Sequence, residues 1–267
     1  AQLTISYNPT GPADDLCSPS AIGGYLGAEN QAIRVQLLDA THLIWGFDNA
    51  SPLYRVTVGP DGKTVTMLTA PKDQHHFPLS GQVVEMLPRS ADLSNGEGIA
   101  ELQGYLSKVD TSYNPDLQEF KLLTGLPANF SNAGEPYFYM RVWHRGTDLA
   151  SAPAIVFTPG TPLSLGNTGV VVNITGTQFN AGDHWVIAAR PETPDQVVPW
   201  AFENAPGLPP NGILRFLAPL GILQWQMDSS GSLVGKIIHD CRKKFRPLTD
   251  RDCCCTFTVG DGLSSHG

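Results

Sequence analysis

Short runs of alternating apolar and polar residues recur along this sequence, separated by Gly, Pro, Asn and Asp. A period of two is typical of strands that bury one face. The chain contains 27 Gly and 22 Pro, a composition that suits tight turns between strands. No long stretch keeps a helical period with caps at its ends. The sequence therefore predicts a mainly β protein built from antiparallel sheets.

The turn signals indicate where the strands begin and end. The Asp61-Gly62 pair between two alternating runs is a strong hairpin signal. The apolar segment 209–226 is expected to form one long bent strand pair. The other expected strands lie at residues 32–38, 42–47, 53–58, 63–69, 81–87, 101–109, 117–124, 137–145, 169–176, 183–190, 232–238 and 255–259.

The strands are expected to form two packed antiparallel β modules of the sandwich or barrel type. A chain of 267 residues is long enough for one large β domain or two ordinary ones. A loop rich in Pro, Ala, Asn and Gly at residues 125–136 is the expected boundary. The modules are therefore expected at residues 1–130 and 131–267.

Charge and hydropathy exclude two classes of partner. The formal net charge is −8 and no basic stripe is present, which argues against binding of nucleic acid. No apolar run is long enough for a transmembrane helix.

The chain opens AQLTISYNPT, without Met and without an apolar leader. We expect that a leader has been removed or that the chain is an interior piece of a longer protein.

Two long segments, GGYLGAENQAIRVQLLDATHLIWGFDNASPLYRV (23–56) and GDHWVIAARPETPDQVVPW (182–200), carry a resemblance. With residues 81–87, 137–145, 239–249 and 253–262, they resemble a family of large bacterial proteins found near phage-tail-like or contractile-injection loci. The resemblance implies that a right-handed parallel β-helix of the pectate-lyase kind follows this region. The final residues 255–267 resemble the entrance to that β-helix, so the chain is expected to be truncated there. The family has no established activity, so the resemblance assigns neither a reaction nor a catalytic residue to this chain.

The cysteines leave three interpretations open. A disulfide can join Cys241 to one of the consecutive cysteines near the end of the chain, or Cys17 to another. Alternate residues of a strand share a face, so His239 and three of the cysteines can instead supply four zinc ligands. Buried free thiols are the third interpretation. The disulfide candidates are Cys17, Cys241, Cys253, Cys254 and Cys255, and the zinc candidates are His239, Cys241, Cys253 and Cys255.

A second candidate metal site is the pair His75-His76 beside Asp73. Imidazole with a carboxylate suits zinc or copper, although adjacent histidines in a loop rarely chelate together. Acidic loops at residues 11–16, 59–63 and 94–98 offer oxygen ligands for calcium, and turn chemistry explains the same residues. No cofactor is expected, with zinc or calcium as the open alternatives.

The segment MRVWHRG places Arg141, Trp143 and Arg145 on one face of an expected strand. Such a ladder, together with Trp45, can stack on sugar rings or hold a carboxylate. It is equally compatible with a solvated face on which the tryptophan bridges two modules. No nucleophile elbow, phosphate loop or compelling carboxylate pair occurs, so a non-enzymatic role is favoured.

These patterns favour a structural or interaction module of a secreted or particle-associated bacterial protein that positions a β-helix domain. The expected partners are other protein subunits or a C-terminal β-helix domain, with glycans as a further possibility. The alternative function is a carbohydrate-binding or carbohydrate-active protein, since sugar faces stack on aromatic rings. The third is a metal-dependent enzyme. The expected location is extracellular or on a particle.

Overall fold

The structure is a computed structural model that describes residues 1–8, 23–89, 104–130, 135–212 and 219–242. The chain divides into two compact units, Ala1–Ile213 and Leu214–Gly267, called the N-terminal and C-terminal units below. The protein is mainly β, with antiparallel sheets that include a closed six-stranded barrel. The fold class predicted from the alternating pattern is therefore confirmed.

The regular elements are strands and short 3-10 turns. The strands are β1 (Gln2–Tyr7), β2 (Gln31–Leu37), β3 (His42–Phe47), β4 (Leu53–Val58), β5 (Thr64–Met67), β6 (Val83–Pro88), β7 (Tyr105–Asn114), β8 (Glu119–Leu122), β9 (Phe138–Trp143), β10 (Ile155–Val156), β11 (Leu163–Ser164), β12 (Val170–Thr175), β13 (His184–Arg190), β14 (Thr193–Val198), β15 (Gly221–Met227) and β16 (Leu233–Asp240). The 3-10 turns are η1 (Asp48–Ala50), η2 (Gln74–His76), η5 (Ala128–Phe130) and η6 (Trp200–Glu203). No helix in these described ranges is long and apolar enough to cross a membrane.

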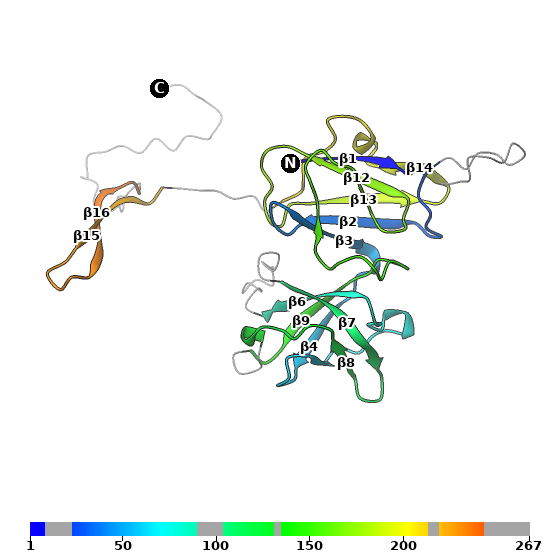
Figure 1. Ribbon diagram of the computed structural model, residues 1–267, viewed down its shortest axis with the longest axis horizontal. Helices are drawn as coiled ribbons and strands as arrows, with labels where there is room; N and C mark the ends of the chain where they lie inside the picture. Colours follow the sequence, from blue (N-terminus) through cyan, green and yellow to red (C-terminus); the bar gives the residue numbers. More distant parts are fainter. Residues whose placement is uncertain (9–22, 90–103, 131–134, 213–218, 243–267) are drawn as a thin grey trace, which may run out of the picture. The chain divides into compact units, whose positions relative to one another are not determined.

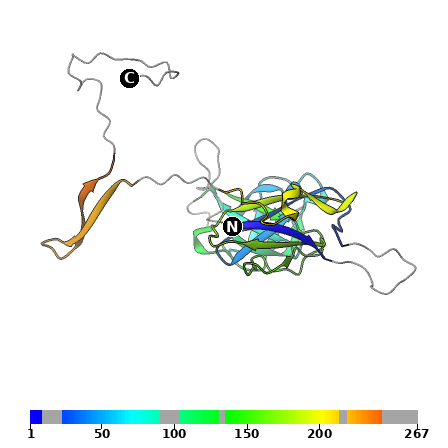
Figure 2. The same cartoon turned by 90° about the horizontal axis from the view of Figure 1, so that it is seen from above.

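A β-sandwich occupies part of the N-terminal unit. One sheet has the strand order β1-β12-β11 and the other has the order β10-β3-β2-β13-β14 (Figures 1 and 2). Side chains from the two sheets share one core, in which Leu3 of β1 and Val172 of β12 lie with Val35 of β2 and Trp185 of β13. Burial of one face of each sheet explains the alternating pattern.

The barrel is inserted into the sandwich between β3 and β10. Its strands follow the closed order β4-β5-β8-β7-β6-β9 (Figure 1). Strand β9 closes it by pairing with β4 on one side and with β6 on the other. The boundary expected near residue 130 is thereby corrected, because β9 follows that residue and completes a barrel whose other strands precede it.

Strand β9 also joins the barrel to the sandwich. Phe138, Met140 and Val142 point into the barrel core, as alternation requires. Trp143, on the outer side, packs with Ile44 of β3 in a small separate cluster. The backbone N–H of Phe47, at the end of β3, then donates to the His144 carbonyl at 2.7 Å. The N-terminal unit is therefore continuous across this junction.

The hairpin predicted at Asp61-Gly62 is confirmed by the pairing of β4 with β5. Gly62 has φ of 67°, a left-handed conformation that glycine adopts without steric cost. The Asp61 carboxylate accepts from the backbone N–H groups of Lys63 at 3.0 Å and Thr64 at 2.9 Å. Turn formation thus accounts for the acidic residue in the loop 59–63. The other candidate calcium loops, 11–16 and 94–98, lie outside the described residues.

The strand pair expected at 209–226 is replaced by a different pairing. The described strand in this region, β15, begins at Gly221 and pairs with β16, which follows it in the sequence (Figure 1). The turn at Asp228–Ser232 explains why, since the Asp228 side chain accepts from the backbone N–H groups of Ser230 and Ser232, each at 2.8 Å. This Asp-centred turn favours reversal after Met227.

Candidate functional site

A pocket of about 330 Å³ lies where the sandwich meets the barrel. Its walls come from residues 25–29 and Gln31 before and in β2, Phe47 at the end of β3, residues 144–147 after β9, and residues 167–168 between β11 and β12. Ligand sites often occur at such junctions. The residues that line the pocket therefore decide whether it can bind or transform a small molecule.

Arg145 lines this pocket and is 5% exposed. Its Nε donates to the carbonyl of Trp45 at 2.9 Å, and its terminal nitrogens donate to Ala152 at 2.8 Å and Pro153 at 3.0 Å. Burial lowers the pKa of Arg145 to about 10, an effect that the negative charge of Asp148 opposes. The side chain is thus a protonated clamp that fastens β3 to the loop before β10.

His144 forms an aromatic part of the wall. Its ring centroid lies 6.1 Å from that of Phe47, and its Nδ1 accepts from the backbone N–H of Gly146 at 3.2 Å. Burial lowers the pKa of His144, and the electrostatic interaction with His76 acts in the same direction. The ring is therefore neutral at pH 7. Among the described lining residues, no hydroxyl or thiol is hydrogen-bonded to it, so the pocket lacks the pair that nucleophilic catalysis uses.

The predicted Arg–Trp ladder is part of the protein interior. Trp45 and Trp143 are 0% and 2% exposed, so neither ring can stack on a sugar, which corrects the prediction. Trp143 donates from Nε1 to Oε2 of Glu85 at 2.9 Å, and the Arg141 guanidinium lies 5.7 Å from its ring centroid. Trp143 packs with Ile44 and Val83 between the sandwich and the barrel and does not lie on a solvated face.

The remaining tryptophans separate into two groups. Trp185 is buried in the sandwich core. Trp200 in η6 and Trp225 in β15 are 68% and 64% exposed. Trp200 and Trp225 are therefore accessible for aromatic stacking on a ligand, and the three buried rings are not.

The candidate metal ligands His75 and His76 lie in η2. The Asp73 carboxylate caps this turn, accepting from the His75 backbone N–H at 2.8 Å and from His76 Nδ1 at 2.9 Å. Within the part of the chain that the structure describes, no group of three or more His, Cys, Asp or Glu residues could hold a metal ion. The capped turn accounts for the Asp–His contact, and a zinc or copper site here stays a prediction.

The structure places two of the predicted cysteine-site residues together. His239 and Cys241 lie at the end of β16, with Cys241 Sγ 3.5 Å from His239 Nδ1. The Cys241 thiol forms no disulfide with another described residue. Cys17, Cys253, Cys254 and Cys255 lie outside the described residues, so the disulfide and zinc interpretations stay predictions.

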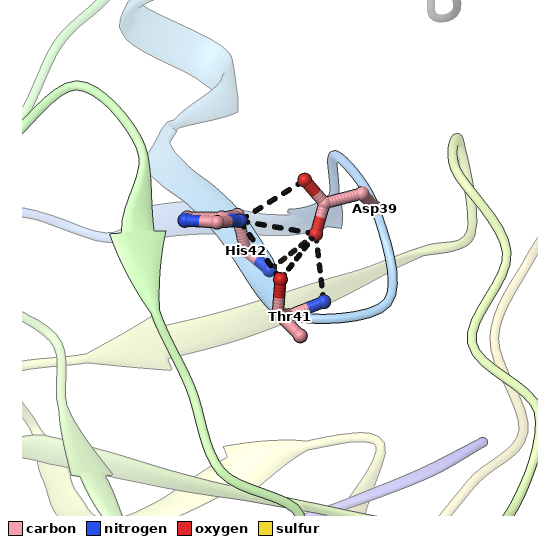
Figure 3. A network of polar contacts seen from close by, with 3 residues as sticks. All are labelled: Asp39, Thr41 and His42. Carbon is pink, nitrogen blue, oxygen red and sulfur yellow. Dashed lines mark hydrogen bonds and ion pairs between the residues drawn. The ribbon is translucent and has the colours of Figure 1, made fainter.

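A polar network that the sequence did not predict lies in the turn between β2 and β3 (Figure 3). The Asp39 carboxylate accepts from the backbone N–H groups of Thr41 at 2.7 Å and His42 at 2.8 Å. It also accepts from the Thr41 hydroxyl at 2.9 Å and from His42 Nδ1 at 3.0 Å. An Asp followed by a hydrogen-bonding residue in a hairpin turn was the available signal. The network holds the turn in place.

We expect the Asp39 turn to weaken in acid. The hydrogen bonds, led by the one from the Thr41 backbone N–H, lower the pKa of Asp39 from 3.8 to about 2. Because the folded pKa is depressed, the contribution to stability is present above pH 3.8 and disappears as the pH falls through about 2. An NMR titration of the Thr41 and His42 amide signals should show a midpoint near 2. A midpoint at 3.8, or the same titration in an Asp39→Asn variant, would contradict this assignment.

The C-terminal unit presents an exposed apolar surface on the β15–β16 hairpin. In antiparallel pairs, residues directly opposite each other share a face. The register pairs Leu223 with Ile237 and Met227 with Leu233, and Trp225 lies on the same face between them. These five side chains, called the apolar face below, are each at least half exposed. The alternation Leu-Gln-Trp-Gln-Met in the sequence was the signal that could have identified this surface.

The opposite face of the hairpin is mixed. It carries Gln224, Gln226 and Lys236 together with Ile222 and Val234. The two strands pair only with each other among the described strands. The apolar face is thus a sheet surface with no second layer of described residues packed on it.

The chain was compared with protein-family models, with curated proteins and with solved structures, and none of them matched.

Proposed function

We propose that this chain is a non-catalytic interaction module that contacts a partner protein through the apolar face of the β15–β16 hairpin. The observation that carries the proposal is the exposure of all five side chains of that face. Contiguous apolar patches larger than roughly a few hundred Å² on a protein surface mark sites of association.

Burial of the apolar face would supply substantial association energy. Covering Trp225 alone would remove roughly 150 Å² of apolar surface from water, worth about 4 kcal/mol before the costs of association. A two-stranded hairpin is marginally stable in water without a packed layer. Contact with a partner would therefore stabilise β15 and β16 as well as bind the two proteins together.

The biological setting forms part of the proposal. The resemblance of residues 23–56 and 182–200 to proteins from phage-tail-like and contractile-injection loci supports a secreted or particle-associated bacterial protein. In that setting the module would position a β-helix domain against other subunits. A glycan as the partner stays a prediction, for which Trp200 is the exposed aromatic ring in the N-terminal unit.

The test is whether the apolar face is open in the isolated chain. The full chain is held at high dilution with a reductant, and acrylamide quenching of tryptophan fluorescence is measured. Of the five tryptophans, Trp200 and Trp225 should be accessible. The Trp225→Lys variant should lose one accessible ring, whereas Gln226→Lys, on the opposite face of the same strand, should lose none. A shielded Trp225 at high dilution would mean that the chain covers its own face, and the proposal would fail.

A further inference from the structure

We propose that the partner of the apolar face is the same face of a second copy of this chain. The inference rests on the proposed function, because it names the partner of that surface. It follows from the charge and area of the face and from the two-stranded sheet that carries it.

The face is largely uncharged. Trp225 lies opposite Gly235, and the indole covers the space that a side chain at Gly235 would fill. Between the turn and Ile237 the face carries no charged side chain, since Lys236 lies on the other side. Asp240, at the open end, is paired with Arg242 at 2.8 Å.

An uncharged face can pack against an identical one. In a two-fold interface the same surface meets itself, so any like charge on it would repel its equivalent. The five side chains of the apolar face create no such repulsion. The net charge of −8 disfavours the approach of two copies, and the five uncharged side chains of this face add nothing to that repulsion.

The available area matches the requirement of a small dimer. The five side chains of the face together expose roughly 600 Å² per copy, so two copies would bury about 1,200 Å², the lower limit for specific interfaces. Trp225 lies near the centre of the face, where aromatic residues contribute most to binding. Complete burial of the face in two copies would therefore reach the lower limit for a specific interface.

The small size of the sheet supports association as well. The described sheet contains β15 and β16 alone, and a two-stranded hairpin without a packed layer is marginally stable in water. Two hairpins packed face to face would form two layers around one small core, which is the arrangement that stabilises sheets in general. The second copy would supply the missing layer.

The experiment measures the mass of the full chain in solution. Sedimentation equilibrium with a reductant present, which prevents dimers linked through cysteines, is run from nanomolar to high micromolar concentration. The wild-type mass should rise from 28.7 kDa to twice that value as the concentration increases. Trp225 should become protected from acrylamide over the same range. Trp225→Lys should weaken the dimer at least about 30-fold, as expected for a central aromatic residue.

Two further variants make the result specific. Leu233→Lys changes the same face from the other strand and should also give monomers, while Gln226→Lys should dimerise as the wild type does. Circular dichroism checks that the sandwich and barrel are intact in each variant.

The outcomes separate this inference from the proposed function. A wild-type chain that stays monomeric with an accessible Trp225 would overturn the second-copy inference and leave the face open to another partner. A monomer with a shielded Trp225 would overturn both. A dimer that Trp225→Lys and Leu233→Lys leave intact would show that another surface associates, and would also overturn the inference.

Discussion

Replacing Arg145 with methionine is expected to lower the free energy of unfolding of the N-terminal unit by about 3 kcal/mol, since hydrogen bonds from a buried charged group contribute roughly 1.5–3 kcal/mol each. The variant would leave the carbonyl groups of Trp45, Ala152 and Pro153 without the donors that they have in the structure. The folded variant no longer carries the cost of removing a charged guanidinium from water, and this gain offsets part of the effect. Denaturant unfolding followed by tryptophan fluorescence measures the change.

The matched control is Arg141→Met. Arg141 lies two residues earlier and is less buried than Arg145, and its guanidinium lies over the Trp143 ring. Such a contact contributes about 0.5–1 kcal/mol. If Arg141→Met and Arg145→Met lowered the free energy of unfolding equally, the three hydrogen bonds of Arg145 would contribute no more than the ring contact of Arg141. Arg145→Lys should fall between them, because an ammonium group cannot reach three carbonyls in the planar fork geometry.

Replacing Trp143 with alanine should cost about 4 kcal/mol of stability, within the range measured for large aromatic residues in cores. The indole is 2% exposed and packs against Ile44 and Val83 at the junction of sandwich and barrel. Its removal would leave a cavity there and deprive Glu85 of the indole donor. Thermal or denaturant unfolding should show a clearly lower midpoint temperature or midpoint denaturant concentration.

Two variants separate packing from hydrogen bonding at Trp143. Trp143→Phe keeps an aromatic ring but removes the N–H that Glu85 accepts, and a cost of about 1–2 kcal/mol is expected. Trp200→Ala removes a ring that is 68% exposed and should change stability by less than about 0.5 kcal/mol. If Trp143→Ala were no worse than Trp200→Ala, the junction would not depend on the buried indole.

Local patterns in the sequence predict most of the strands but not how they associate. The run at residues 42–47 coincides with β3 and the run at 53–58 coincides with β4, because a two-residue period and flanking turn residues act over a few positions. Strand β14, with Pro194 and Asp195 inside it, lacks that period and was not predicted. Its pairing with β13 overrides its weak local preference.

The barrel required tertiary information. Strand β9 pairs with β4 and β6, which precede it by many residues, and no local signal encodes which distant edges meet. The Pro- and Gly-rich loop near residue 130 is a true break between strands, but strands on its two sides complete one barrel. Turn-forming residues such as Pro and Gly mark the ends of strands and do not by themselves mark the ends of domains.

The tryptophans show where the sequence ceases to determine the structure. Trp143 and Trp225 each occupy alternating runs that assign them to one face of a strand. The sequence alone determines that assignment, because neighbouring side chains of a strand point to opposite faces. Only the tertiary structure decides burial, since it depends on what packs against the face. Trp143 is covered by β3 and β6 side chains, whereas no described layer covers Trp225.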